Sequence, residues 1–206
     1  MNAHPLSIKA ATAVLALGAW LALLAACGGQ AEAPGQTPEA GETPSPVSGN
    51  ATAFSLVSEA FGNDETIPAL YTCDGDNVSP ALAWSGVPEG TQSFALITDD
   101  PDAPGGTFTH WLLYNMGSSA PSLPEGVETV PMPAYGLAGF QGSNDAGGIG
   151  YTGPCPPPGD PHRYRFTLYA LDQTVELEPG ASKQQLLDAI EGHVLAEAEL
   201  AGLYGR

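Results

Sequence analysis

The chain has 206 residues, enough for one ordinary domain with additional segments at its ends. It carries 5 Lys and Arg against 23 Asp and Glu, a formal net charge of −18 at pH 7. A surface this acidic repels phosphate backbones and anionic lipid headgroups, so we expect no nucleic-acid partner. An anionic ligand would need a locally organised pocket.

The N-terminal segment has the pattern of a targeting sequence. An uncharged apolar stretch, residues 10–26, follows Lys9 and ends in small residues, as a cleavable signal does. Residues 24–27, Leu-Ala-Ala-Cys, resemble the bacterial lipobox, in which the cysteine receives lipid. We expect residues 1–27 to be a lipoprotein signal peptide ending at Cys27, the lipidation site. An uncleaved anchor and an ordinary signal peptide are the alternatives.

The next segment, residues 28–52, is rich in Pro, Gly, Glu and Thr and poor in large apolar residues. It cannot bury enough surface to fold, so it predicts a disordered linker. Residues 53–206 then form one domain. With a lipid at Cys27, this domain would be tethered in the cell envelope, on the extracytoplasmic side of a bacterial membrane.

The domain sequence predicts a mostly β fold. Short apolar runs alternate with turns rich in the 26 glycines and 20 prolines of the chain, which also argues against a helical bundle. The clearest strands are residues 93–98, 110–115 and 164–171, with shorter candidates at 54–57 and 82–84.

One helix is expected near the C-terminus. Pro179 and Gly180 break the chain, and Ser182 and Gln185 have the spacing of a capping box. Apolar side chains then recur at helical spacing at Leu186, Leu187, Ile190, Val194, Leu195 and Ala198. We expect this helix to cover one end of the sheet.

A first polar block follows the strand at 93–98. Because Pro101 cannot donate to a sheet, we expect this strand to end with Asp100 and Asp102 at the sheet rim. A hairpin return would bring His110 beside Asp100, where the carboxylate would favour the protonated imidazole. The alternative is that both aspartates only cap turns.

A second polar block spans residues 151–164. Its prolines fix the backbone and its glycines permit sharp turns, so Pro156 and Pro157 should form a stiff wall. The two-residue period of a strand places His162 and Tyr164 on one face. Two imidazoles, a phenol and exposed backbone N–H groups can bind a compact anion such as phosphate.

These blocks resemble segments of the phosphatidylethanolamine-binding protein family, in its bacterial Raf-kinase-inhibitor-like branch. The matching segments, in the family's order, are YTCDG at 71–75, NVSP at 77–80, DPDAP at 100–104, HW at 110–111, GPCPP at 153–157, HRY at 162–164 and LYALD at 168–172. The resemblance implies an antiparallel β-sandwich with short peripheral helices, a C-terminal helix and a small, rigid anion pocket.

In the family this pocket takes phosphate-bearing groups, including the phosphoethanolamine headgroup. Carried over by position, the resemblance implies a pocket lined by Asp100, His110, His162 and Tyr164, with Pro156 and Pro157 as a wall. Asp102 also matches, and we expect it mainly to hold the turn. Phe108 departs from the tryptophan of many relatives, which predicts a pocket more open on that side.

Two cysteines besides Cys27 lie in the matched segments. An even pair in an exported domain indicates a disulfide between Cys73 and Cys155, which would stiffen the pocket rim. Two separate reduced thiols are the alternative.

We expect a binding protein and not an enzyme, because the sequence offers acid–base candidates and no obvious nucleophile. The ligand would be small and phosphorylated or otherwise anionic. The alternatives are a protein-interaction module or inhibitor, of a kinase or a serine protease, acting on an envelope partner, and a hydrolase using an Asp–His pair.

No cofactor is expected, and no metal. The candidate ligands Asp100, Asp102, His110 and His162 are suitable in type, but no ligand-pair spacing accompanies them.

Overall fold

The computed structural model describes residues 53–134 and 139–206. The expected signal peptide, the lipidation site Cys27 and the linker at 28–52 lie outside the described residues, so these three predictions stand as predictions. Within the described ranges, no helix has both the length and the apolar character needed to cross a membrane.

The described residues form nine strands and two short helices, and the predicted mostly β, sandwich-like fold is confirmed. In chain order the elements are β1 (Ser55–Val57), β2 (Glu65–Thr66), the 3-10 helix η1 (Ala69–Tyr71), β3 (Leu82–Ser85), β4 (Ser93–Asp100), β5 (Phe108–Gly117), β6 (Ser122–Leu123), β7 (Phe140–Gln141), β8 (His162–Leu171), α1 (Lys183–Ile190) and β9 (Val194–Tyr204).

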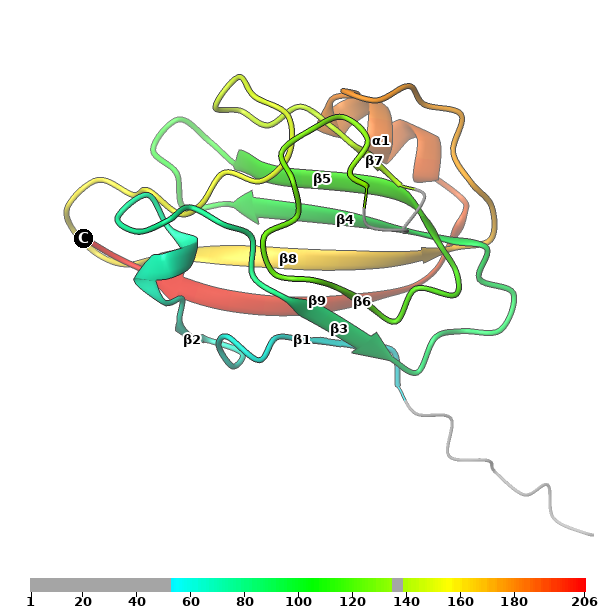
Figure 1. Ribbon diagram of the computed structural model, residues 1–206, viewed down its shortest axis with the longest axis horizontal. Helices are drawn as coiled ribbons and strands as arrows, with labels where there is room; N and C mark the ends of the chain where they lie inside the picture. Colours follow the sequence, from blue (N-terminus) through cyan, green and yellow to red (C-terminus); the bar gives the residue numbers. More distant parts are fainter. Residues whose placement is uncertain (1–52, 135–138) are drawn as a thin grey trace, which may run out of the picture. The chain divides into compact units, whose positions relative to one another are not determined.

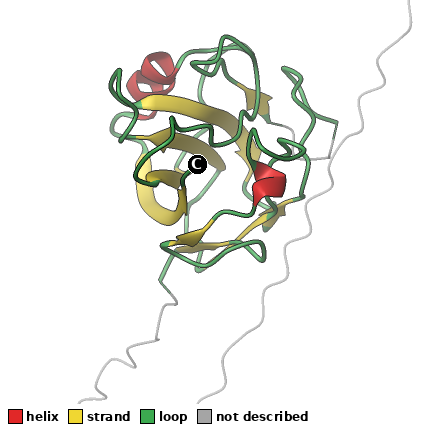
Figure 2. Ribbon diagram, turned by 90° about the vertical axis from the view of Figure 1, so that its left-hand side faces the viewer, coloured by secondary structure: helices red, strands yellow, loops and turns green. Residues whose placement is uncertain are grey.

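The strands make two sheets, visible as separate layers in Figure 2. The smaller sheet has the order β1-β3-β6, and the larger has the order β2-β9-β8-β4-β5-β7. Neighbours pair antiparallel except β2, whose two residues run parallel to β9. Strands β5, β4, β8 and β9 lie side by side in Figure 1.

The larger sheet is covered on both faces, which explains why residues 94–97 of β4 form a continuous apolar run. Alternate residues point to opposite faces. Phe94 and Leu96 pack toward the smaller sheet in the main core, whereas Ala95 and Ile97 pack beneath α1 in a second cluster. All four are buried, with exposed fractions of 2% or less.

The C-terminal helix is shorter than predicted. The capping box of Ser182 and Gln185 is present, but α1 ends at Ile190, and Gly192 adopts the left-handed backbone with φ of 80°. The helical continuation predicted through Val194, Leu195 and Ala198 is wrong, because those residues belong to β9, paired along its length with β8.

The face that α1 covers also differs from the expectation. Leu186 and Ile190 of α1 pack on Ala95, Ile97 and other residues of one sheet face, so the helix covers a face and not an end. Val194 and Leu195 are 40% and 42% exposed, so these apolar residues are not part of the core. Their helical spacing therefore did not indicate a buried helix face.

Three strand ends meet at one end of the larger sheet, on the left of Figure 1, where the C-terminus also lies. β4 ends there at Asp100, while β5 and β8 begin there at Phe108 and His162. In the pairing of β4 with β5, Thr98 lies opposite Trp111 and Asp99 opposite Thr109. His110 is therefore the extra residue of a β-bulge, a feature that re-aims a side chain at a sheet rim.

Candidate functional site

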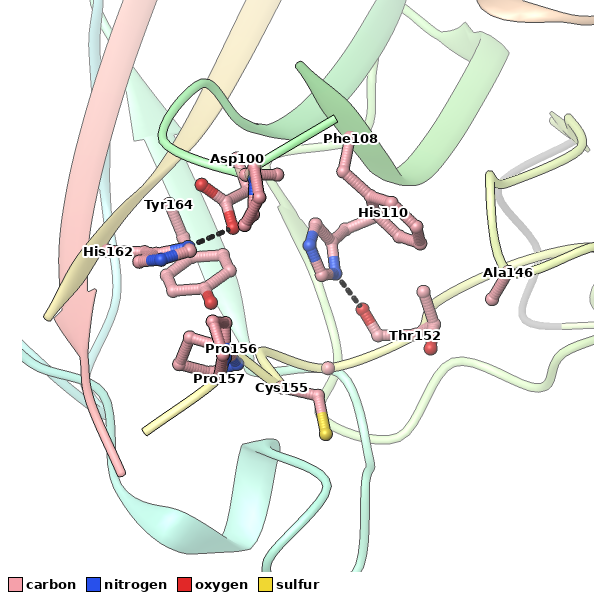
Figure 3. Close-up of a pocket in the computed structure, with 13 residues that line it drawn as sticks. Asp100, Phe108, His110, Ala146, Thr152, Cys155, Pro156, Pro157, His162 and Tyr164 are labelled. Atoms are coloured by element: carbon pink, nitrogen blue, oxygen red, sulfur yellow. Dashed lines mark hydrogen bonds and ion pairs between the residues drawn. The ribbon is translucent and has the colours of Figure 1, made fainter. Parts of the chain in front are cut away.

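A cavity of about 270 Å³ opens at this end of the sheet, between the strand ends and the proline-rich segment after Thr152. It brings together six of the residues predicted for the site: Asp100, His110, Pro156, Pro157, His162 and Tyr164. Phe108 and Cys155 also line it (Figure 3). Asp102 does not line this cavity and lies in an adjoining hollow behind His162 and Pro157.

Asp100 is the buried acceptor around which one side of the pocket is organised. Its side chain lies 2.7 Å from the ring of His162, measured from Oδ2 to Nδ1, and its Oδ1 accepts the N–H of Asp102 at 2.9 Å. Asp102 in turn accepts the N–H of Arg163 at 2.8 Å. Asp102 thereby ties the turn after β4 to the start of β8, the turn-holding role expected of it.

The predicted pairing of Asp100 with His110 is wrong, since the partner of Asp100 is His162 (Figure 3). A hairpin argument sees only the next strand in sequence, which is β5. β4 has β8 on its other side, and His162 begins that strand. Both histidines therefore flank the end of β4, and the carboxylate bonds the one from β8.

His110 is bonded to the backbone instead. Its Nδ1 lies 2.7 Å from the carbonyl oxygen of Thr152, which can only accept, so Nδ1 carries the proton. Burial lowers the pKa of His110 below its usual range, and the Thr152 carbonyl and the charge of Asp100 oppose that shift only in part. The ring is thus held neutral, contrary to the protonated form predicted, and its Nε2 is an acceptor.

The Tyr164 hydroxyl has the Asp100 carboxylate and the Cys155 N–H as polar neighbours, but neither meets it at hydrogen-bond geometry. The side chain is 1% exposed, and its hydroxyl is buried without a hydrogen-bond partner among the described residues. Burial, reinforced by the charge and the acceptor oxygens of Asp100, raises the pKa of this phenol far above its usual range, and the Cys155 N–H opposes the shift only in part. The hydroxyl therefore stays protonated, and its ring meets that of His110 edge-on with centroids 5.2 Å apart.

The wall of the pocket is fastened to the segment around η1. Cys73 and Cys155 form a disulfide with Cα atoms 5.4 Å apart. The Cys73 N–H donates to the carbonyl of Pro154 at 3.0 Å, and the Gly153 N–H donates to Oδ1 of Asn77 at 2.7 Å. Gly153 is required here, because a Cβ atom would lie 2.3 Å from the carbonyl oxygen of Tyr71.

Two contributors to the site escaped the sequence reasoning. Thr152 orients His110 through its carbonyl, and Asn77 holds the wall through its side chain. A backbone carbonyl carries no residue-type signal, so nothing in the sequence marks Thr152. Asn77 lies within the matched segment 77–80, which was the available signal for it.

No lysine or arginine of residues 53–134 and 139–206 lines the pocket. Among the described residues, every such side chain is ion-paired elsewhere: Arg163 with Asp64, Arg165 with Glu199, Lys183 with Asp99 and Arg206 with Asp74. An anion in the pocket would have to be held by the phenol, the imidazoles and backbone N–H groups. In residues 53–134 and 139–206, no group of three or more His, Cys, Asp or Glu side chains could hold a metal ion.

Comparisons with known proteins fit this architecture. Residues 57–205 match the family model described as phosphatidylethanolamine-binding protein. A UPF0098 protein of Methanothermobacter thermautotrophicus is 52% identical over 153 residues, covering 74% of this chain and 99% of the relative. A UPF0098 protein of Aquifex aeolicus is 48% identical, with 73% and 88% covered.

Two solved structures are also similar. E. coli YbcL, described as a member of the mammalian PEBP family, superposes with a TM-score of 0.70 at 34% identity, over 74% of this chain and 98% of that one. A protein of Chlamydia trachomatis, described as a homologue of the same family, gives a TM-score of 0.68 at 42% identity, over 75% and 98%.

Proposed function

The chain belongs to the phosphatidylethanolamine-binding protein family, as its motifs predicted, and from this membership and its pocket we propose that it binds a small phosphate-bearing ligand. Free phosphoethanolamine, a phosphomonoester with the chemistry of a lipid headgroup, is the model ligand. The protein acts by binding and not by catalysis. It does so at the cell envelope, tethered by a lipid at Cys27 on the extracytoplasmic side of a bacterial membrane.

The observation that carries the proposal is the free hydroxyl of Tyr164. A buried polar group without a partner costs roughly 1–3 kcal/mol. Trp84 Nε1, Thr98 Oγ1 and Asp99 Oδ1 are also unpartnered among the described residues, but of these four residues Tyr164 alone lines the cavity. The Tyr164 side chain lines the cavity together with both histidines. A phosphate oxygen placed there would accept its proton and remove the cost.

The protonation state of the pocket predicts which form of phosphate binds. Neutral His110 offers the acceptor Nε2, and Tyr164 offers a donor. A phosphomonoester carrying one proton matches both, because its P–OH donates to the imidazole and its charged oxygen accepts from the phenol. The second pKa of such esters is about 6, so this form is the minority at neutral pH.

Two further features support the extracytoplasmic part of the proposal. Disulfides persist mainly in oxidising compartments, and this domain carries one between Cys73 and Cys155. The lipobox-like residues 24–27 provide the anchor. A direct test is metabolic labelling of the expressed chain with a fatty acid: label is expected in the native chain and absent in Cys27→Ala. Equal labelling of the two would refute the anchor.

Ligand binding is tested by calorimetric titration of the protein with phosphate, phosphoethanolamine, acetate and chloride at pH 6 to 8. We expect binding of the phospho-ligands, with affinity falling toward tenfold per pH unit above pH 7 because the complex retains one extra proton. His110→Ala should abolish it. The matched control His193→Ala removes an exposed histidine bonded to Asp172 and should leave it unchanged.

The contrary result is also defined. If no phospho-ligand binds the native protein, the pocket is not a phosphate site. The alternative function, binding of a protein partner in the envelope, would then be favoured. If a chromogenic phosphoester is hydrolysed and Asp100→Asn stops the reaction, the binding-only role is refuted in favour of a hydrolase.

A further inference from the structure

The disulfide occupies a position from which it can control the pocket. Cys73 and Cys155 are both exposed, so a soluble thiol can reach them. Cys155 at the same time lines the ligand cavity and directly precedes the wall residues Pro156 and Pro157. One bond therefore faces solvent on one side and supports the binding site on the other.

The wall has few other ties. Within residues 154–158 only Cys155 has a backbone N–H, because the remaining four residues are prolines. Such a segment cannot be held by a ladder of backbone hydrogen bonds. The backbone ties are the Pro154 carbonyl, which accepts the Cys73 N–H, and the Gly159 N–H, which donates to the carbonyl of Arg206 at 3.3 Å. The Cys155 N–H also lies near the Tyr164 hydroxyl. Between Pro154 and Gly159, the disulfide of Cys155 with Cys73 is the covalent link that holds the wall to the segment around η1.

One sulfur of the disulfide lies beside a cation that is ion-paired with Asp74. The Arg206 guanidinium approaches Sγ of Cys155 at 3.7 Å, measured from Nη1, while its Nε is 3.3 Å from a carboxylate oxygen of Asp74. A guanidinium next to a sulfur stabilises the thiolate, and a stabilised thiolate is the better leaving group in exchange. The environment therefore distinguishes the two sulfurs and favours release of Cys155.

We propose that the Cys73–Cys155 disulfide is a thiol–disulfide exchange site for a dithiol reductant, and that its reduction releases the proline wall and weakens ligand binding. The second half of the proposal rests on the proposed function. The first half does not, since exchange at these sulfurs needs no ligand.

The chemistry of the step is balanced. A thiolate of the dithiol attacks Sγ of Cys73, forming a mixed disulfide, and the electron pair of the broken S–S bond leaves on Cys155 as a thiolate. The second thiol of the reductant, once deprotonated, attacks the mixed disulfide and releases Cys73 as a thiolate. The protein gains two electrons and takes up the two protons lost by the dithiol, which ends as a cyclic disulfide.

The exchange is tested by incubating the native, folded protein with dithiothreitol, blocking thiols with iodoacetamide at intervals, and cleaving after glutamate. Because Glu32, Glu65, Glu89 and Glu128 separate the cysteines, each cysteine is read on its own peptide. We expect Cys73 and Cys155 to become labelled together while the protein remains folded by circular dichroism. Labelling only after unfolding would overturn the exchange site.

The role of Arg206 has its own variant and control. Arg206→Gln should slow reduction about threefold or more, because the leaving thiolate loses its cation. Arg165→Gln removes another exposed arginine, paired with Glu199 away from the disulfide, and should not change the rate. Equal rates in native protein and Arg206→Gln would refute the assignment of Cys155 as leaving group.

Release of the wall is measured without ligand by hydrogen exchange. The amides of Cys73 and Gly153 bond across the tie, whereas the amide of Gly142 bonds to Leu112 elsewhere. Reduction, or the double variant Cys73→Ser with Cys155→Ser, should accelerate exchange at the first two amides and not at Gly142. Unchanged protection in the folded, reduced protein would overturn the release.

The effect on binding is then measured by titrating phosphate into both redox forms. We expect the reduced protein to bind about fivefold more weakly, because the wall must be reordered on binding. Equal phosphate affinity of the oxidised and reduced forms would refute the proposal that the disulfide regulates binding. If phosphate binds neither form, the proposed function fails, while labelling and hydrogen exchange still decide the exchange site and the wall.

Discussion

Two buried tyrosines on the same sheet differ in the hydrogen bonding of their hydroxyls. Tyr114 in β5 and Tyr164 in β8 are 0% and 1% exposed. The Tyr114 hydroxyl beneath α1 donates to the carbonyl of Glu178 at 2.5 Å and accepts the N–H of Ala181 at 3.3 Å. The Tyr164 hydroxyl, at the end of the sheet, has no partner in the described residues.

The difference separates polar groups that hold the fold from those available to a ligand. Under α1 and beside β7, buried side chains bond one another or nearby carbonyls, which rigidifies that region. At the pocket, Asp100 accepts the N–H of Asp102, and Asp102 accepts the N–H of Arg163. The Tyr164 hydroxyl has no hydrogen-bond partner among the described residues. The comparison predicts that changes in the first region cost stability and changes in the second cost binding.

The largest effect is expected at Gln141, which is 0% exposed and bonds on both ends of its amide. Its Oε1 accepts from the indole of Trp111 at 2.6 Å, and its Nε2 donates to the carbonyls of Glu128 and Val130 at 2.6 and 2.7 Å. Gln141→Leu leaves these groups unpaired, so the free energy of unfolding should fall by about 3–5 kcal/mol. Denaturant unfolding measures the loss, and a loss within the error of the method would contradict the structural role.

Removing the disulfide should cost nearly as much. It closes a loop with a sequence separation of 82 residues, for which the chain-entropy model gives about 4.5 kcal/mol. The double variant Cys73→Ser with Cys155→Ser should therefore unfold at lower denaturant than the oxidised native chain. Coincident unfolding curves would show that the bond contributes nothing to stability.

Tyr114→Phe should cost less, about 1–2 kcal/mol, because it strands the Ala181 N–H and the Glu178 carbonyl. Its affinity for phosphate should match that of the native protein, since Tyr114 lies on the face covered by α1. A weakened affinity at unchanged stability would erase the distinction between the two regions.

The smallest effect is a dependence of stability on pH through His110. Burial lowers its folded pKa from the ordinary 6.5, so below that pH the unfolded chain takes up the proton first. The contribution of His110 is therefore complete above pH 6.5 and is lost as pH falls. Between pH 7.5 and pH 5, the free energy of unfolding should decrease less in His110→Asn than in the native protein. The asparagine keeps a donor for the Thr152 carbonyl. An equal drop in both proteins would contradict the assigned neutral ring.

Sequence patterns predicted the strands and the members of the pocket because both depend on residue type. The two-residue period of β8 places His162 and Tyr164 on one face, and Pro101 ends β4 at Asp100. The partners within the pocket depend instead on which strands are neighbours. That β8 lies beside β4 is a long-range fact, and local spacing assigned Asp100 to the wrong histidine.

The end of α1 and the tautomer of His110 escaped prediction for related reasons. Apolar residues at the start of β9 continue the helical spacing by coincidence, and only Gly192 signals the break. The protonation of His110 follows from its burial and from its contact with a backbone carbonyl, and neither can be inferred from the residue types in the sequence.

The most direct test of the central claim is Tyr164→Phe, measured for both unfolding free energy and phosphate affinity. If the hydroxyl is reserved for a ligand, the variant should be at least as stable as the native protein, because it loses an unpaired buried group. Its affinity for phosphate should fall about tenfold, as for loss of one hydrogen bond to a charged group. A variant that loses stability as Tyr114→Phe does, and binds phosphate as the native protein does, would contradict the account.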